Sequence, residues 1–535
     1  MIFSLAILGS FVIYLIIGAV VSRTIKSKDD YFVSGRNAPT VLVGGTLVAS
    51  FLSTVSFMGE LGFSYDGYAT AMLILVPLNI SGYVIGVVFF GRYLRRSEAL
   101  TVPEFFGKRF NSRGLQAITG LTVIVGIGFY LIAVTQGMML VISQLTGLKG
   151  WQALLLVWAG YTVFTMLSGA RGVLINDTIM YFIFTIAALG GMGWVFHRAG
   201  GPAEAFEKMW NIPERPDALT WHGLTGPDAY MGSPTQVLIY SITLGIVWML
   251  VVAISPWQSS RYLMAKNEHV SMRSGLMATA SIALIYVFLT FGGLAISLFN
   301  PSIEPSEVAF IWAAQHLMPP ALGVIAVTGI VAAGLSSAAS FLSLVGFSLD
   351  NDVMPWLASR RPKLQPKNAG VRLTRIAMAG VAVAVLLITL VAPPAVLTIG
   401  YFAATLFAAS WGPVAIWSIQ SKKITRRGAT WGVIVGFLAV GILEGLQNFA
   451  GVTLPTLANP VLIGITASIL AIALGNIGQP RDQAALEFLE TLRAVPAENK
   501  SRVETRRTGI WVIVTLATLA VCSAIMLAFY ALPTF

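Results

Sequence analysis

Apolar segments of about 20 residues recur along the whole chain, and they constrain its fold more than any other feature. A helix of this length spans the hydrocarbon core of a bilayer while satisfying its own backbone hydrogen bonds. Charged residues make up 11% of the chain, against about 25% in soluble globular domains. The soluble classes are therefore excluded, and the predicted fold class is an all-α polytopic membrane protein. We predict fourteen spans, over residues 2–22, 40–62, 69–91, 115–144, 151–168, 172–196, 235–255, 274–298, 321–349, 373–391, 395–419, 428–448, 457–475 and 509–532.

Basic residues are distributed unevenly over the connections between these spans. If the N-terminus lies on the outer side, only Lys149, Arg198, Lys208 and Arg215 fall in outer connections, and the other 30 of the 34 Lys and Arg residues fall on the cytoplasmic side. This is the distribution that the positive-inside rule describes. We therefore expect an integral, multi-pass protein of the plasma (inner) membrane with both termini on the outer side. The net charge of +11 then reflects topology and contact with the lipid bilayer, and no nucleic-acid partner is expected.

Hydroxyl groups are concentrated in the ninth span, at Ile330–Leu349 (IVAAGLSSAASFLSLVGFSL). Lipid offers a hydroxyl no hydrogen-bond partner, so each one must bond within the protein or face a ligand. Ser336, Ser337 and Ser340 lie one and four residues apart, which places them along one edge of a helix. A cluster of neutral oxygens at mid-membrane depth suits a dehydrated alkali cation, which favours a transporter. The alternative is a close helix–helix seam, because Ala333 and Ser337 are small and lie four residues apart.

The second span carries small and hydroxyl residues in its middle, among them Ser53 and Thr54, and we expect the helix to be interrupted there. Transporters built from inverted repeats use interrupted helices at matching positions in their two halves to expose backbone carbonyls. The second and seventh spans lie five apart. We therefore interpret them as the first helices of two five-helix repeats.

Carboxylates inside the spans are few, and two of them are candidate functional groups. Asp177 lies six residues past Arg171 on the cytoplasmic half of the sixth span, near the depth expected for Ser340. Such a group forms a cation site or an exit path; the alternative is an Asp177–Arg171 pair or a helix cap. Glu60 lies near the outer end of the second span, either at an outer gate or in the interface.

Enzyme signatures are missing from the sequence. The four histidines are scattered over connections without metal-ligand spacing, and no P-loop, GxSxG or dinucleotide fingerprint occurs. We therefore expect a protein that is not an enzyme and that uses no organic cofactor.

Four sequence elements together resemble the sodium/solute symporter family, which includes sodium/galactose, sodium/proline and sialic acid symporters. They are DYFVSGRN at 30–37, GARGVLINDTIMYF around Asp177, RYLMAKNEHVSMRSG from Arg261, and AAGLSSAASFLSLVGFSLDND, in which Ser336 precedes Asp352 by sixteen residues. These elements are spread over about residues 1–420. The resemblance therefore covers the predicted transport core.

The resemblance implies a LeuT-type fold. One leading helix with its loop (1–39) would precede a five-plus-five inverted-repeat core (40–419), and three trailing helices with a cytoplasmic loop at 475–508 would follow (420–535). It also implies a sodium site formed by five residues: the carbonyls of Ala49, Leu52 and Ala333, and the hydroxyls of Ser336 and Ser337. Some relatives bind a second sodium, for which Asp177, Ser336 and Ser340 match here. Ala339, however, stands where that site requires a hydroxyl.

The pocket implied for the solute differs from that of the sugar-transporting relatives. Those relatives place Asn, Glu and Gln where this chain has Phe51, Val55 and Ser56, which argues against a galactose-like pocket. No Lys or Arg is expected to point into the core. The remaining candidates for contact with the solute are Ser53, Thr54, Ser56, Gln136, Tyr240 and Trp248.

The function expected from these features is sodium-coupled symport of a small polar organic solute by alternating access, with Na+ as the coupling ion. One alternative is a proton-coupled carrier of the same fold, in which Asp177 would titrate. The other is a membrane sensor that binds a solute without moving it. The identity of the solute, the stoichiometry and the oligomeric state are left open.

Overall fold

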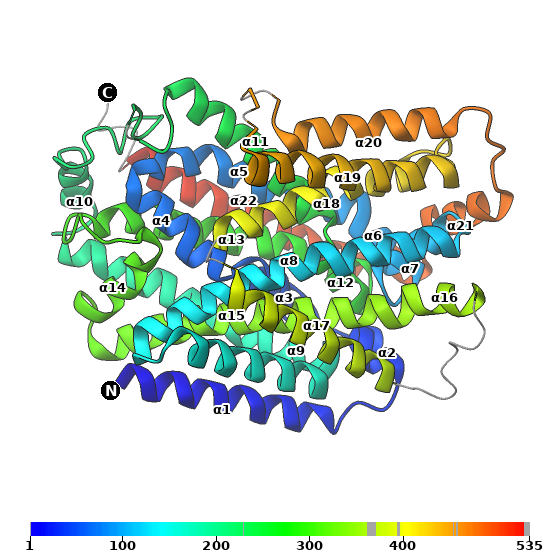
Figure 1. The fold of residues 1–535 in the computed structure, drawn as a ribbon, viewed down its shortest axis with the longest axis horizontal. Helices are drawn as coiled ribbons and strands as arrows, with labels where there is room; N and C mark the ends of the chain where they lie inside the picture. The colour runs from blue at the N-terminus through cyan, green and yellow to red at the C-terminus, as the bar shows by residue number, and fades with distance from the viewer. Residues whose placement is uncertain are drawn as a thin grey trace.

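The apolar segments form long helices that lie side by side in a bundle, with shorter helices at its two ends (Figure 1). The computed structural model describes residues 2–227, 229–360, 371–392, 396–452, 454–455 and 458–528, apart from the side chains of residues 55–57, 397, 449 and 498. Within these ranges the structure is helical and has no sheet, so the predicted all-α class is confirmed. The α-helices are α1 (Ile2–Ser22), α2 (Lys28–Val33), α3 (Thr40–Phe51), α4 (Leu61–Phe63), α5 (Ala69–Gly86), α6 (Arg92–Ser97), α7 (Val102–Arg109), α8 (Arg113–Thr146), α9 (Gly150–Arg198), α10 (Pro202–Met209), α11 (Pro234–Ile254), α12 (Pro256–Met264), α13 (Glu268–Ile296), α14 (Ala309–His316), α15 (Pro320–Ser348), α16 (Met354–Arg360), α17 (Arg372–Val391), α18 (Val396–Gln420), α19 (Arg426–Ala450), α20 (Pro460–Asn476), α21 (Gln483–Arg493) and α22 (Arg502–Met526).

Eleven helices in the described part of the chain are long and apolar enough to cross a membrane. Within the described residues, each of the fourteen predicted spans overlaps a helix, and the second is interrupted at Leu52. The two numbers differ because α3 and α20 are shorter apolar helices and because the fifth and sixth predicted spans run together as α9. The exact number of spans therefore stays a prediction.

The helix α9 consists of two halves that run in opposite directions, joined at Gly169, whose backbone has φ 52° and ψ −157°. In the first half, Phe164 packs against Gly18 of α1. In the second half, Gly190 lies beside Leu322 of α15. Gly169 lies in the connection predicted between the fifth and sixth spans.

Two of the long elements are interrupted, and both interruptions lie inside the bundle. After α3 the backbone of Leu52 is extended, with ψ 95°, and a helical segment resumes as the π-helix η2 (Val55–Glu60). After α11 the backbone of Ser255 is extended, with ψ 149°, and α12 begins at Pro256. The residue before a proline disfavours the helical region, and proline suits the first turn of a new helix. The expected interruption of the second span is therefore present. The matching interruption on the seventh element lies at Ser255, where the predicted span (235–255) ends, and the element continues past it as α12.

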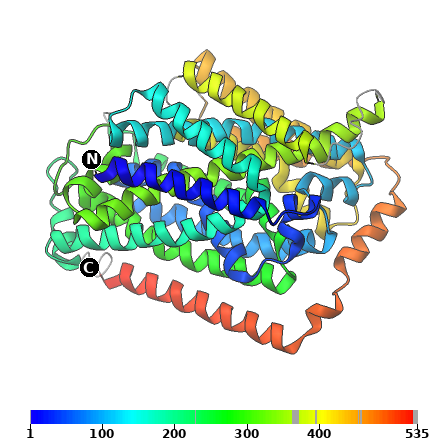
Figure 2. The same cartoon turned by 90° about the horizontal axis from the view of Figure 1, so that it is seen from below.

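The helix α15 lies at the centre of this arrangement and packs against α9, α8 and α3. At the periphery, α22 runs along one edge of the bundle, where it contacts α13 (Figure 2). Helix α1 begins and α22 ends at the same end of the bundle (Figures 1 and 2). Following the predicted orientation, we call the opposite end, which holds α2, α7, α16 and α21, the inner end.

Candidate functional site

The interruption after α3 lies against α15. Thr46, before the interruption, and Ser336 of α15 both donate hydrogen bonds to the carboxylate of Asp177, over 2.5 and 2.7 Å. On the other side of the interruption, Thr54 packs so closely on Gly334 that a Cβ there would lie 3.0 Å from the Thr54 methyl group. The interrupted backbone from Ala49 to Leu52 is therefore held between two contacts with the serine-rich part of α15. The last carbonyls of a helix have no intrahelical donor, so those of α3 are available to a ligand.

The hydroxyl of Ser337 is completely buried and has no hydrogen-bond partner in the described structure. A buried hydroxyl without a partner costs about 1–3 kcal/mol. Ala333 precedes Ser337 by one helical turn, and both residues are fully buried. The hydroxyl of Ser337 is therefore an oxygen to which the protein itself supplies no partner.

A buried ion pair lies beside Ser336 and Ser340 of the same helix. The Arg261 guanidinium lies 3.7 Å from the Asp177 carboxylate and donates a 2.5 Å hydrogen bond to Ser340. Ser340 in turn lies 3.5 Å from Asp177. The network thus joins α9, α12 and α15, and its charged side chains are nearly inaccessible to solvent.

This ion pair corrects two sequence-based expectations. Arg171 does not pair with Asp177; it lies 3.9 Å from Asp30 instead. A basic side chain does enter the core, because α12 restarts at Pro256 inside the bundle and carries Arg261 toward Asp177. The sequence-based prediction ended the seventh span at residue 255 and therefore placed Arg261 in a connection.

Glu60 is buried rather than interfacial. Its side chain is 4% exposed, and its carboxylate accepts a hydrogen bond from the Tyr286 hydroxyl of α13. The interfacial alternative is therefore wrong. Glu60 joins η2 to α13 on the outer side of the interruption.

The other predicted solute contacts separate into two aromatic groups. Trp248 is buried, and its ring centroid lies 5.8 Å from that of Phe51 and 6.0 Å from that of Tyr401. Its indole N–H has no hydrogen-bond partner in the part of the chain that the structure describes. Tyr240 lies two turns further out on α11, in a cluster with Phe63, 6.0 Å away between centroids. The structure therefore places Tyr240 above Trp248 rather than beside it.

Three more predicted solute contacts are buried polar residues near the interruption: Ser53, Thr54 and Gln136. The Thr54 hydroxyl has no hydrogen-bond partner within the described ranges, and it packs on Gly137, next to Gln136 on α8. The side chain of Ser56 lies outside the described residues.

Asn79 of α5 is a buried polar residue that the sequence-based prediction missed. Both amide atoms of this fully buried side chain lack a hydrogen-bond partner among the residues that the structure describes. It lies one helical turn from Tyr83, whose ring contacts Phe51 at 6.3 Å. An amide within the apolar third span was the signal that could have identified it.

Oxygen atoms dominate the centre of this site. Among the described residues, no group of three or more His, Cys, Asp or Glu side chains could hold a metal ion. Hydroxyl and carbonyl oxygens with a single carboxylate nearby suit a monovalent hard cation better than a divalent transition metal.

Comparisons with known proteins agree with this geometry. The family model described as the sodium:solute symporter family matches residues 31–436. The sodium/proline symporter of Salmonella typhimurium is 25% identical over 462 residues, covering 82% of this chain and 87% of the relative. Sodium/glucose cotransporter 1 of Ovis aries is 25% identical over 488 residues, covering 82% and 71%.

A solved structure supports the fold. The substrate-bound outward-open state of a Na+-coupled sialic acid symporter matches with a TM-score of 0.71 and 19% identity, covering 90% of this chain and 99% of that one. The shared fold is the LeuT-type arrangement of two five-helix repeats. In it, the interrupted elements α3–η2 and α11–α12 take the place of the two first helices.

Proposed function

The chain belongs to the sodium:solute symporter family, and on this basis we propose that a sodium ion binds where the interruption after α3 meets Ser336 and Ser337 of α15. The protein is a sodium-coupled symporter rather than an enzyme, and it is an integral membrane protein with many spans. The observation that carries the site is the buried Ser337 hydroxyl, which has no partner within the described structure.

The proposed ligands are the carbonyls of Ala49, Leu52 and Ala333 and the hydroxyls of Ser336 and Ser337. Because Ser336 donates its proton to Asp177 over 2.7 Å, its oxygen lone pairs are left to face a cation. Asp177 therefore orients a ligand without belonging to the proposed first site. Asp177 and Ser340 are proposed as the start of the path by which the ion leaves.

Sodium at this site would couple to the solute by joining the two halves of the core. The ion contacts the interrupted segment and α15 together, so it stabilises the conformation in which they are adjacent. A ligand shifts a conformational equilibrium only by its difference in affinity for the two states, which is typically about 1–3 kcal/mol for coupled sites.

We propose that a small polar organic solute binds between the interrupted segment and α11, in contact with Ser53, Thr54, Ser56, Gln136, Tyr240 and Trp248. The unpartnered indole N–H of Trp248 favours a solute with a hydrogen-bond acceptor. Phe51, which contacts Trp248, provides an apolar wall. Glu60, bonded to Tyr286, is proposed as part of an outer gate.

The membrane orientation and the division of the chain belong to the same proposal. Both termini would lie on the outer side of the plasma membrane, as the Lys and Arg distribution favours. Residues 40–419 would form the transport core, flanked by 1–39 and 420–535.

Ser337→Ala tests the sodium site. Removing one ligand to a cation should cost about 1.5–3 kcal/mol, so the sodium concentration for half-maximal uptake should rise about tenfold or more. The control is Ser410→Ala, which removes an equally buried hydroxyl that already bonds to the Leu406 carbonyl over 2.6 Å. An unchanged sodium dependence in Ser337→Ala, or an equal change in both variants, would refute the assignment.

Trp248→Phe tests the solute site. Purified protein would first be screened with a solute panel that includes proline and glucose, for stabilisation that requires sodium. For the solute found, loss of the indole donor should weaken apparent affinity about fivefold, the value of one neutral hydrogen bond. Trp221→Phe, at a half-exposed position in the outer loop, should leave affinity unchanged. Equal affinity of Trp248→Phe and the unmodified protein would remove Trp248 from the pocket.

A further inference from the structure

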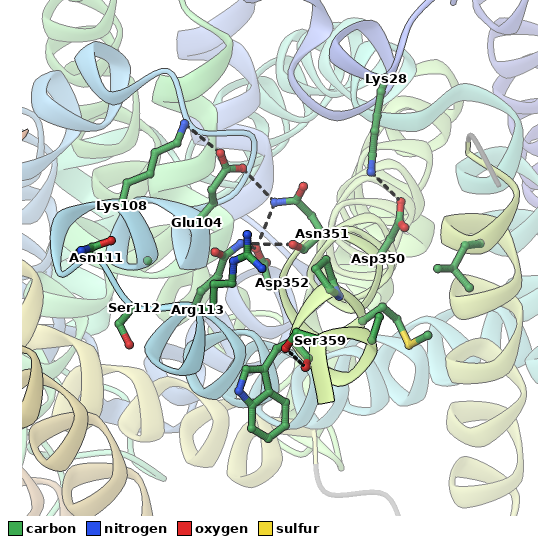
Figure 3. A pocket seen from close by; sticks show the side chains of 17 residues that line it. Lys28, Glu104, Lys108, Asn111, Ser112, Arg113, Asp350, Asn351, Asp352 and Ser359 are labelled. Atoms are coloured by element: carbon green, nitrogen blue, oxygen red, sulfur yellow. Dashed lines mark hydrogen bonds and ion pairs between the residues drawn. The ribbon is translucent and has the colours of Figure 1, made fainter. Parts of the chain in front are cut away.

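A cavity of about 970 Å³ opens at the inner end of the bundle (Figure 3). Three acidic side chains line it, Glu104 of α7 and Asp350 and Asp352 of the π-helix η6 (Leu349–Val353), which follows α15. Lys28, Lys108 and Arg113 also line it, so the cavity as a whole is not strongly acidic. What distinguishes its three carboxylates is therefore whether each has a cationic partner.

Two of the three carboxylates are paired with lysine. Asp350 lies 3.2 Å from Lys28 and accepts a 2.6 Å hydrogen bond from Thr374. Glu104 lies 2.9 Å from Lys108. The negative charges of Asp350 and Glu104 are therefore each balanced by a lysine of the protein.

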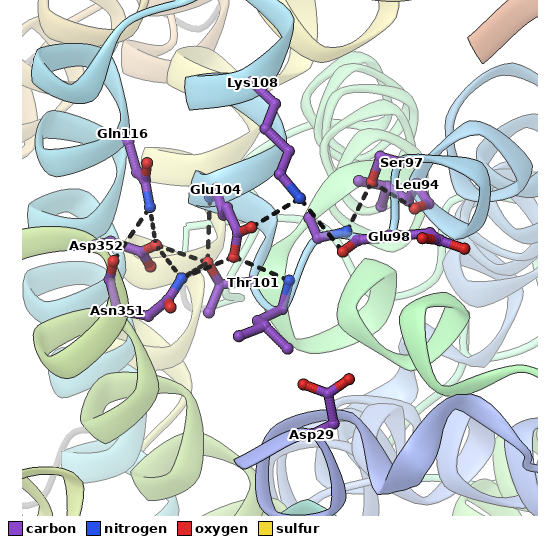
Figure 4. Close-up of polar contacts among 12 residues, drawn as sticks. Asp29, Leu94, Ser97, Glu98, Thr101, Glu104, Lys108, Gln116, Asn351 and Asp352 are labelled. Carbon is purple, nitrogen blue, oxygen red and sulfur yellow. Dashed lines mark hydrogen bonds and ion pairs between the residues drawn. The ribbon is translucent and has the colours of Figure 1, made fainter. Parts of the chain in front are cut away.

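Asp352 differs from both neighbours, because it is only 1% exposed and forms no ion pair among the described residues. Its Oδ1 accepts three hydrogen bonds, from Thr101 at 2.7 Å, Gln116 at 2.9 Å and Asn351 at 3.1 Å (Figure 4). Its Oδ2 is buried and has no hydrogen-bond partner among the described residues. Neutral donors hold the side chain in place, and one oxygen remains for a cation.

A second, much smaller cavity of about 20 Å³ lies between the Asp177 network and Asp352. Most of its lining is apolar, and its polar lining residues are Thr101, Ser260, Arg261, Ser340, Ser343 and Ser348. Ser340 faces Asp177 on one side of this cavity, and Thr101 bonds Asp352 on the other. Asp352 lies about 18 Å beyond Ser340 along the helix axis.

We infer that Asp352 forms a second, transient site for a monovalent cation, through which sodium passes from Asp177 into the inner cavity. The inference rests on the proposed sodium site and extends it inward. Oδ2 of Asp352 and water from the cavity would supply the ligands, whereas the Thr101 hydroxyl, which already caps α7, would keep Asp352 in place.

The first test compares transport rate with equilibrium sodium binding in Asp352→Asn. The amide keeps the size of the side chain and a carbonyl oxygen for the three donors but removes the charge. Sodium-driven uptake into proteoliposomes should slow about tenfold, because the ion loses a charged oxygen ligand, and a bond to a charged group is worth about that factor in affinity. The sodium concentration for half-maximal thermal stabilisation, which reports the site at Ser336 and Ser337, should not change.

Two variants serve as controls for this test. Asp352→Glu retains the charge and should restore most of the rate, whereas Asp350→Asn removes a charge that Lys28 already pairs and should transport at nearly the normal rate. Normal transport in Asp352→Asn, or equal loss in Asp352→Asn and Asp352→Glu, would overturn the inference. The proposed sodium site at Ser336 and Ser337 is tested separately: if that site is wrong, Ser337→Ala will leave the sodium concentration for half-maximal uptake unchanged.

A second measurement leaves Asp352 in place, so it does not depend on the folding of its variants. Cys522 is the only cysteine of the chain and would be replaced by alanine. A cysteine is then introduced by Ser343→Cys, in the lining of the smaller cavity. A small neutral methanethiosulfonate reagent added from the inner side should modify it, and sodium chloride should slow that reaction more than choline chloride does, because an ion on its way to Asp352 occupies the same space. No modification of this cysteine, or equal rates in the two salts, would overturn the inference.

Discussion

Asp177→Ala is expected to destabilise the protein by about 3–5 kcal/mol, because it leaves the Arg261 guanidinium buried without its carboxylate. The two side chains are 0% and 3% exposed, and the separation between their charged atoms is 3.7 Å. Water cannot compensate the charge that remains. The variant also removes the acceptor of Thr46 and Ser336, two buried hydroxyls. Transport should be abolished together with stability.

A double-mutant cycle separates the ion pair from other consequences of the substitution. Arg261→Ala alone should also be strongly destabilising, and Asp177→Ala combined with Arg261→Ala should cost clearly less than the sum of the two. The measurement is the free energy of unfolding in a denaturing-detergent titration of the purified protein. The control is the pair Arg171 and Asp30, at 3.9 Å and partly exposed, for which coupling should stay below about 1 kcal/mol. If the losses in free energy of unfolding for Asp177→Ala and Arg261→Ala simply add in the double variant, the two side chains do not stabilise each other as an ion pair.

Gly169→Ala is expected to prevent correct assembly of the two halves of α9. A backbone with φ 52° and ψ −157° is accessible to glycine but costs other residues about 1–3 kcal/mol. In addition, a Cβ at this position would lie 2.5 Å from the ring of Tyr31 and 2.8 Å from its carbonyl oxygen. The carbonyl belongs to the backbone of α2 and cannot rotate away. The summed loss should exceed about 3 kcal/mol, enough to lower the yield of folded protein severely.

The matched control is Gly193→Ala, in the same element. A Cβ there has no neighbour within 4 Å, and the substitution should be neutral or slightly stabilising. The measurement is the amount of monodisperse protein extracted from membranes and its thermal midpoint. A folded Gly169→Ala variant with the normal midpoint would show that the reversal of α9 does not depend on this glycine.

Much of the fold was predictable because membrane spans are local features of a sequence. An apolar run of sufficient length forms a helix whatever it packs against, so the spans were found from the sequence alone. The interruption near Ser53 was predictable for a similar reason, because small and hydroxyl residues in mid-membrane mark helices with irregular backbone. The motif around Ser336 supplied the candidate cation site.

The partners of each polar group were less predictable, since they depend on how distant helices pack. Arg261 was assigned to a connection because the sequence around it is polar, and only the restart of a helix at Pro256 brings it to Asp177. The pairing of Arg171 with Asp30 was missed for the same reason, because the two residues are far apart in the sequence and meet only when the helices pack. The sequence analysis missed Asn79 because a single amide in an apolar segment forms no repeating pattern. Its place near the site becomes evident only from the contact between Tyr83, one turn away, and Phe51.

The hydroxyl of Ser336 belongs both to the proposed sodium ligands and to the Asp177 network. A change that strengthens the bond between Ser336 and the proposed ion also alters the hydrogen bond from Ser336 to Asp177. Because Asp177 pairs with Arg261, that change would in turn affect the position of Arg261 on α12, the second part of the interrupted helix α11–α12. Thermodynamic linkage makes the effect reciprocal. The hydrogen bond from Ser336 to Asp177 therefore gives the two interrupted helices a second link, through the proposed ion and Arg261, in addition to the direct contact between Phe51 and Trp248.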